Sequence, residues 1–247
     1  MASQILAYSR SFGGRVPNTA INLRKLGLRT AIISDAGNDF KSSHYMDYLT
    51  KLGIPSKGIV INSSKATTQV YIFTDKTGEN HTFVNIGSEE IDDTIITNNR
   101  SFWGIIIKKA KILHMSSANS KLNVELAFMY KNIPNHNKIP AYKMCWNNKK
   151  KSRYRIDLYI PTDELILRTQ ALKLSLLMDF TGTSDAFVSG ILYGYLTSWS
   201  WKESVGIAQI LIKNVGNDIG TYISCIAPKL KLAQELNINN IEAIKYG

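Results

Sequence analysis

The chain has 247 residues, enough to bury the core of one substantial α/β domain, and its hydrophobic content of 44% is ordinary for a folded protein. Its formal net charge of +11 excludes a strongly acidic protein and suits a phosphate-bearing substrate, nucleic acid or an anionic membrane surface. The longest uncharged run, residues 186–201, is shorter than the roughly 18 residues that a membrane-spanning helix needs. We therefore expect no membrane span.

Cysteine and histidine usage points to a reduced compartment. Cys145 and Cys225 are far apart in the sequence, and neither they nor the histidines have the spacing of a metal site. The apolar stretch near the start, residues 5–8, is too short for the hydrophobic region of a signal peptide. We expect a cytoplasmic protein and predict no metal-binding residues.

The first third of the chain alternates helical and extended patterns. Apolar residues recur at helical spacing after the glycine pair 13–14, until Gly27 supplies a C-terminal cap. Residues 30–34 are typical of a buried strand, and a second helical pattern opens at Asp39 and ends near Gly53. This alternation predicts crossover connections and a mostly parallel sheet with helices on its faces.

The middle of the chain changes texture. Residues 67–86 form two β-rich stretches around a glycine turn at 75–78, which predicts a hairpin. A buried strand is predicted at 111–115 and a moderately amphipathic helix at 122–130. The pattern is lost over residues 132–155, which form either a long irregular loop or a poorly specified region.

A basic patch closes that interval. It consists of Lys149, Lys150, Lys151, Arg153 and Arg155. A run of this kind is either a solvated surface or a phosphate-backbone contact in a nucleic-acid-binding protein. Because no recognised nucleic-acid-binding fold accompanies the patch, binding to nucleic acid is the least favoured hypothesis.

The segment 179–185, with the sequence DFTGTSD, has the clearest chemical potential. Its small residues lead directly into an apolar helix, whose N-terminus offers unpaired N–H groups and the positive end of the helix dipole to a phosphate. Asp185 lies in the first turn, where it can accept a proton from a hydroxyl group aligned against that phosphate. The alternative is that Thr183 or Ser184 only caps the helix and that Asp185 complements the dipole.

A second segment could bind an acceptor molecule. The paired glycines Gly13 and Gly14 let the backbone approach a ligand, and Asn18 offers a donor and an acceptor to a polyol. The alternative is again capping, because asparagine is a favoured N-cap. In the later helix, Gly190 and Gly194 are four residues apart, which predicts close packing against a neighbouring element.

Together these motifs resemble the ribokinase family, also called the phosphofructokinase-B family. The matching residues are Gly13-Gly14-x-x-x-Asn18, Gly37-x-Asp39 and DFTGTSD, and the look is closest to archaeal nucleoside kinases. The resemblance implies a three-layer α/β/α sandwich with a mostly parallel sheet. One domain would span residues 1–247, with a small β lid formed by about residues 1–12 and 66–87.

The resemblance also implies an ATP-dependent phosphotransferase that acts on a hydroxymethyl group of a sugar or nucleoside. Asp185 would be the base, and the amides of Gly182, Thr183 and Ser184 would form an anion hole for the transferred phosphoryl group. Magnesium would bridge the nucleotide phosphates.

The acceptor side follows from the same resemblance. Gly13, Gly14 and Asn18 would hold the sugar, and the lid would cover the substrate and exclude water. Lid strands join the dimers of several family members, so a homodimer through the lid is a further expectation.

Some segments depart from the family pattern. Only twelve residues precede Gly13, and Ser184 stands where the family has a second glycine. The interval between Leu165 and Asp179 leaves little room for the strand and the glycine-containing nucleotide loop of the family. We therefore expect a relative that is shortened at the N-terminus and on the ATP side. An alternative function is a catalytically impaired relative that binds a sugar or nucleoside without phosphoryl transfer.

Overall fold

The computed structural model describes residues 10–74, 80–88, 91, 93–115, 120–131, 144–146, 153–154, 156–160, 164–169, 172–173, 181–216, 222–223 and 236–245. The predicted turn at 75–78, most of the interval 132–155, Lys149–Lys151, Arg155, Asp179 and Cys225 lie outside these residues.

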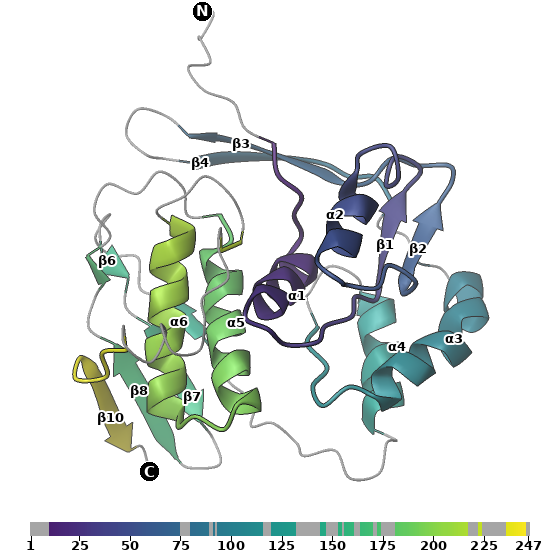
Figure 1. Cartoon of the computed structure of the whole chain (residues 1–247). Helices are drawn as coiled ribbons and strands as arrows, with labels where there is room; N and C mark the ends of the chain where they lie inside the picture. Colours follow the sequence, from purple (N-terminus) through teal and green to yellow (C-terminus); the bar gives the residue numbers. More distant parts are fainter. Residues whose placement is uncertain are drawn as a thin grey trace, which may run out of the picture.

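Helices and strands are mixed along the described chain (Figure 1). The helices are α1 (Arg15–Lys25), α2 (Tyr45–Lys51), α3 (Asp93–Lys108), α4 (Ser120–Lys131), α5 (Thr183–Leu196) and α6 (Trp201–Gly216). The strands are β1 (Ser34–Gly37), β2 (Ile59–Asn62), β3 (Gln69–Thr74), β4 (Asn80–Asn85), β5 (Met144–Trp146), β6 (Arg153–Tyr154), β7 (Ile156–Ile160), β8 (Leu165–Thr169), β9 (Leu172–Lys173) and β10 (Ile241–Lys245).

The largest described sheet has the order β10-β8-β7-β5, and all its pairs are antiparallel. Among the described strands only β1 and β2 pair in parallel, while β3–β4 and β6–β9 are antiparallel. The expected α/β class is confirmed, but the described strands do not form the mostly parallel sheet that we expected. For β7 and β8 the short link explains the difference, because a parallel pair needs a crossover of about a dozen residues or more.

Helices α5 and α6 lie side by side over one face of the four-stranded sheet (Figure 1). Phe187 and Ile191 of α5 pack with Leu158 of β7 and Leu167 of β8 in one buried cluster. The close approach of the helices depends on Gly190, where an added Cβ would overlap the backbone of Ala208, and on Gly194, where an added Cβ would overlap the side chain of Ser204. The predicted packing role of these two glycines is confirmed.

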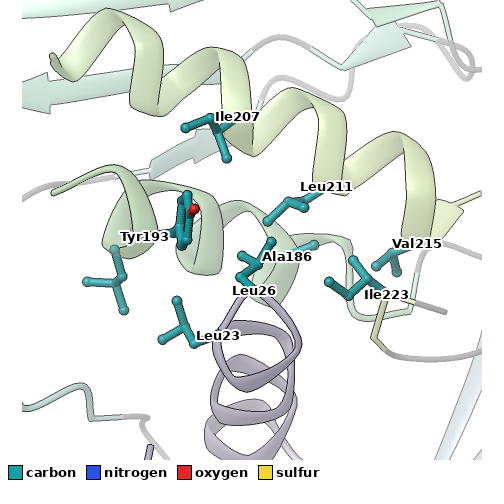
Figure 2. Close-up of a cluster of buried hydrophobic side chains, with 9 residues drawn as sticks. Leu23, Leu26, Ala186, Tyr193, Ile207, Leu211, Val215 and Ile223 are labelled. Atoms are coloured by element: carbon teal, nitrogen blue, oxygen red, sulfur yellow. The ribbon is translucent and has the colours of Figure 1, made fainter. Parts of the chain in front are cut away.

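The other side of α5 is covered as well. Figure 2 shows Leu23 of α1 and Leu26, the C-cap residue of that helix, meeting Ala186 and Tyr193 of α5, next to buried side chains of α6. Because α5 is enclosed on both sides, its sequence is apolar or small nearly all round. The burial of this helix fixes the position of its first turn.

Two further clusters complete the described core. Ile21 of α1 and Leu49 of α2 pack with Ile32 and with Ala36 of β1. Trp103 is fully buried where α3 meets α4, and its indole N–H donates to the carbonyl of Gly58 at 3.2 Å.

The predicted helices at α1, α4 and α5 and the hairpin β3–β4 are confirmed. The strand predicted at 30–34 is wrong, since β1 begins at Ser34, and residues 111–115 are not a strand. In the latter segment Ile112 and Leu113 are half-buried in two different clusters instead of pairing in a sheet. Short apolar runs of this kind do not distinguish a strand from a packed connection.

Candidate functional site

Helix α5 begins directly after a glycine. Gly182 is the N-cap residue, with φ 80° and ψ −6°, a left-handed conformation that favours glycine. Because Gly182 is the N-cap residue and Thr183 and Ser184 already belong to the helix, the interpretation of either of these two residues as the N-cap is wrong. Helix geometry leaves the N–H groups of the first turn without partners inside the helix. The segment is therefore arranged as an anion site would be.

The start of α1 has the same design. Gly14 is its N-cap residue, with φ 111°, and no side chain caps the helix. Asn18 lies one turn inside α1, where its backbone N–H donates to the carbonyl of Gly14 at 2.8 Å. The capping alternative for Asn18 is therefore wrong as well. An added Cβ at Gly13 would meet no atom within 4 Å, so the backbone there borders open space.

The two helix starts meet through one hydrogen bond. The side-chain amide of Asn18 donates to Oδ2 of Asp185 at 2.7 Å, although 167 residues separate them in sequence. The glycine pair 13–14 lies one turn before Asn18, and Gly182 lies just before the turn that carries Asp185. The tertiary structure thus brings the segments of both sequence-predicted groups together.

Asp185 has an unusual environment for a carboxylate. Partial burial raises the pKa of Asp185 to about 6, and the Asn18 hydrogen bond and the positive charge of Arg15 oppose part of that increase. Asn18 itself is only 4% exposed. The carboxylate is ionised at neutral pH but lies close enough to its pKa to exchange a proton readily, as a general base must.

Two supporting residues were missed in the sequence analysis. Arg15, an exposed residue in the first turn of α1, acts on Asp185 through its charge. The Tyr45 hydroxyl donates to the carbonyl of Gly13 at 3.2 Å, and the Phe12 ring stacks on Tyr45 with centroids 4.5 Å apart. The position of Arg15 inside the Gly13–Asn18 segment was the one sequence signal available, whereas the contact with Tyr45 depends on the fold.

The described residues contain no group of three or more His, Cys, Asp or Glu that could hold a metal ion. The carboxylate at the junction of α1 and α5 is Asp185, so a magnesium ion there would take most of its ligands from nucleotide phosphates and water, as this ion commonly does. Within the described ranges, no helix has both the length and the apolar character of a membrane span.

Comparison with known proteins identifies the family of the chain. The family model described as "pfkB family carbohydrate kinase" matches residues 2–162. A nucleoside kinase from Methanocaldococcus jannaschii is 28% identical over 124 residues, which cover 50% of this chain and 38% of that protein. The match therefore spans little more than a third of the relative's length.

Solved structures support the same fold. The crystal structure of the Methanocaldococcus jannaschii nucleoside kinase, an archaeal member of the ribokinase family, aligns with a TM-score of 0.63 and 18% identity, over 95% of this chain and 89% of that chain. A ribokinase from Giardia lamblia aligns with a TM-score of 0.68 and 13% identity, over 96% of this chain and 93% of that chain. The chain has a ribokinase-like fold and belongs to the pfkB family of carbohydrate kinases.

Proposed function

We propose that this protein transfers the terminal phosphoryl group of ATP to a hydroxymethyl group of a sugar or nucleoside. The observation that carries the proposal is the hydrogen bond between Asn18 and Asp185, because it joins an acceptor-binding segment to a base at a helix N-terminus. The similarity to a nucleoside kinase favours a nucleoside as the acceptor.

Asp185 acts as the base in this proposal. As the acceptor oxygen attacks the γ-phosphorus, its proton passes to the Asp185 carboxylate, and the bond between that phosphorus and the β,γ-bridging oxygen breaks to release ADP. A carboxyl with a pKa of about 6 is largely ionised at pH 7 and can return the proton to solvent afterwards. Asn18 orients the carboxylate through its amide group.

The start of α5 stabilises the charge on the transferred group. The amides of Gly182, Thr183 and Ser184 form the anion hole, aided by the helix dipole. Ser184 is not among the residues with positive φ, so its Cβ is compatible with this helix start. The nucleotide phosphates would hold a magnesium ion, which would supply positive charge to offset theirs.

The acceptor is held at the start of α1. Gly13 and Gly14 keep the backbone accessible, and the Asn18 side chain lies next to the base. Binding here would position the acceptor hydroxyl group against Asp185. The enzyme would then hold the reacting groups in the right orientation, so that they need not meet by random encounter.

The hairpin β3–β4 is proposed as a lid and as a contact for a second copy of the chain. Its register pairs Val70 with Val84 on one face and Tyr71 with Phe83 on the other, and all four are at least 48% exposed. A two-stranded ribbon with two apolar faces can cover a substrate with one face and pack against a second copy with the other. This surface supports the proposed homodimer.

Release of ADP from ATP tests the proposal, with ribose, fructose, adenosine, inosine and cytidine as separate acceptors. Acceptor-dependent ADP release is expected with at least one of them. Calorimetry identifies the alternative function, because acceptor binding without ADP release indicates a relative that binds but does not transfer.

A further inference from the structure

The turn after β1 binds the root of the hairpin, residues 66–68 and 87, through one carboxylate. Oδ1 of Asp39 accepts hydrogen bonds from the backbone N–H of Thr67 at 2.8 Å and from the Thr67 hydroxyl at 2.7 Å. The same hydroxyl oxygen accepts from the backbone N–H of Gly37 at 2.9 Å. Thr67 lies two residues before β3, so these bonds anchor the chain where it enters the hairpin.

Glycines clamp the same root from two sides. A Cβ added at Gly37 would overlap the backbone at Ala66 and Thr67, and a Cβ at Gly87 would overlap the carbonyl oxygen of Ala66. The backbone N–H of Gly87 also donates to the Thr68 hydroxyl at 3.0 Å, which ties the exit of the hairpin to its entry. Both strands of the hairpin therefore leave from one tightly packed point.

The charge of Asp39 strengthens this anchor. Partial desolvation raises the pKa of Asp39, but the two hydrogen bonds from Thr67 and the positive charge of Arg10 outweigh it, so the net pKa is lowered. The carboxylate is ionised at neutral pH, and hydrogen bonds to an ionised acceptor are roughly twice as strong as neutral ones.

A chain of aromatic contacts leads from the anchor to the acceptor segment. Phe40, the neighbour of Asp39, packs edge-on against the Tyr45 ring with centroids 5.7 Å apart. Tyr45 in turn donates to the carbonyl of Gly13 and stacks on Phe12. The turn that anchors the hairpin thus also supports the backbone next to Gly14.

We propose that Asp39 is a positioning residue that sets the lid relative to the acceptor segment, through Thr67 on one side and through Phe40 and Tyr45 on the other. The role of the hairpin as a lid rests on the function proposed above. The mechanical part does not, because it concerns only how firmly the hairpin is attached.

Hydrogen exchange of the full-length chain, sampled from milliseconds onward, tests the attachment. Asp39→Ala and Thr67→Val should accelerate exchange in residues 66–74 and 80–88 by about tenfold, the change expected from losing a hydrogen bond to a charged group. Thr67→Ser keeps the hydroxyl and should restore slow exchange. Peptides from α5 and α6 serve as internal references.

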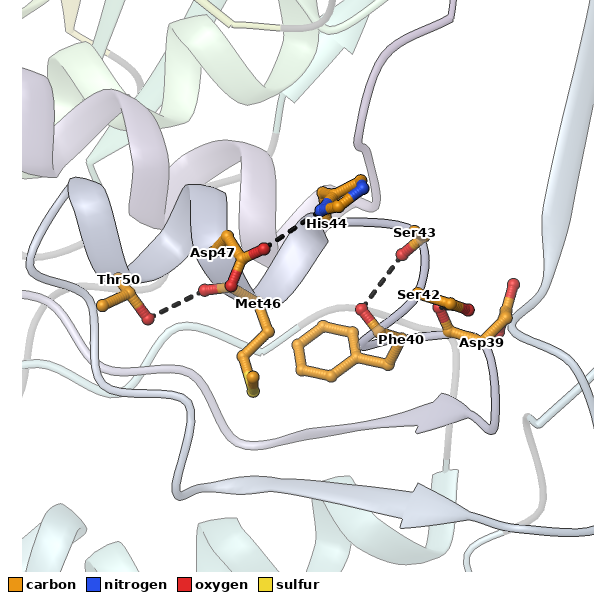
Figure 3. Close-up of polar contacts among 8 residues, drawn as sticks. All are labelled: Asp39, Phe40, Ser42, Ser43, His44, Met46, Asp47 and Thr50. Atoms are coloured by element: carbon orange, nitrogen blue, oxygen red, sulfur yellow. Dashed lines mark hydrogen bonds and ion pairs between the residues drawn. The ribbon is translucent and has the colours of Figure 1, made fainter.

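Asp47→Ala is the matched control. Figure 3 shows Asp47 of α2 next to His44, the N-cap residue of that helix, and away from Asp39. The exposed carboxylate of Asp47 lies 3.1 Å from the His44 ring nitrogen. Exchange in the hairpin should not change in this variant. The proposal is overturned if Asp39→Ala and Thr67→Val exchange as slowly as Asp47→Ala. If Asp39→Ala does not fold, the Thr67→Val and Thr67→Ser pair decides the question.

Kinetics separates positioning from a purely structural role. With an accepted substrate, Asp39→Ala and Thr67→Val should raise KM for the acceptor about tenfold while kcat changes less, and Thr67→Ser should restore KM. If no substrate is turned over by the wild-type chain, the proposed function fails, whereas the exchange result still stands or falls by itself. An unchanged KM together with altered exchange would contradict the link to the acceptor segment.

Discussion

Helix α5 and the hairpin β3–β4 are both rich in apolar residues, yet those of the helix are mostly buried and those of the hairpin are exposed. Phe187 and Ile191 in α5 are 0% and 1% exposed, whereas Phe83 and Val84 in the hairpin are 60% and 55% exposed. The helix has the sheet, α6 and α1 around it, while the hairpin is a two-stranded ribbon attached at its root. An apolar sequence therefore predicts burial only when the fold supplies partners on each side.

The difference in burial also corresponds to a difference in proposed role. In the proposed function, the enclosed α5 holds Asp185 in place as the base, and the exposed hairpin covers the substrate or contacts a second copy. Variants in α5 should therefore change turnover and stability, whereas variants in the hairpin should change self-association. The expected effects decrease from the first turn of α5 to the hairpin.

The largest effect is expected at the start of α5. Asp185→Asn keeps the shape of the side chain but removes the base, so kcat should fall by about 10² to 10⁴-fold. Because desolvation disfavours the Asp185 charge, the variant should be no less stable than the wild type at pH 8 by chemical denaturation. Asp47→Asn, an exposed carboxylate on α2, is the control and should retain full turnover. Full turnover in Asp185→Asn would remove Asp185 as the base.

The next effect tests the packing of α5. Gly190→Ala should destabilise the fold by about 3 kcal/mol, because the added Cβ overlaps the backbone of Ala208 in α6. Gly104→Ala in α3 is the matched control, since a Cβ there meets no atom within 4 Å and alanine is the better helix former. In urea denaturation, Gly190→Ala should unfold at a lower urea concentration than the wild type, and Gly104→Ala at the same or a higher concentration. Equal midpoints would contradict the close contact.

The pH dependence of activity should follow the carboxyl of Asp185. With a pKa of about 6, kcat/KM should fall about tenfold per pH unit below that value. Arg15→Gln removes a positive charge that favours the ionised form, so the midpoint should move to higher pH, whereas Arg29→Gln should not move it. A profile without a midpoint near pH 6 would contradict this assignment.

Stability should respond to pH in the opposite sense. The pKa of Asp185 is raised above its ordinary value of 3.8, so the contribution of this residue to stability is present below that value and is lost as the pH rises through about 6. Asp185→Asn should lack this decline, which denaturation at pH 4 and pH 7 can measure.

The smallest effect on stability is expected in the lid. Phe83→Ser replaces a side chain that is 60% exposed, so the free energy of unfolding should change by no more than about 0.5 kcal/mol. The same change should weaken self-association, which sedimentation velocity measures. An unaltered dimer, or a monomeric wild type, would contradict the proposed contact through the lid.

Local patterns predicted some elements well and others badly. The helix before Gly27 and the hairpin were found because a cap and a turn glycine leave a local signature. The strand at 111–115 was wrong, because its apolar residues pack into two clusters instead of pairing. The second helix begins at Tyr45 and not at Asp39, because the side chain of Asp39 binds Thr67, a contact between residues far apart in sequence.

The sequence by itself determined the family resemblance, the two glycine-containing helix starts and the identity of the acidic residue, because these depend on residue types at short spacing. Only the tertiary structure decided that Asn18 reaches Asp185, that burial raises the pKa of that carboxyl and that Asp39 anchors the hairpin. Each of these depends on distances between segments that are remote in the chain. Such distances follow from the packing of whole helices and strands, which a local pattern does not encode.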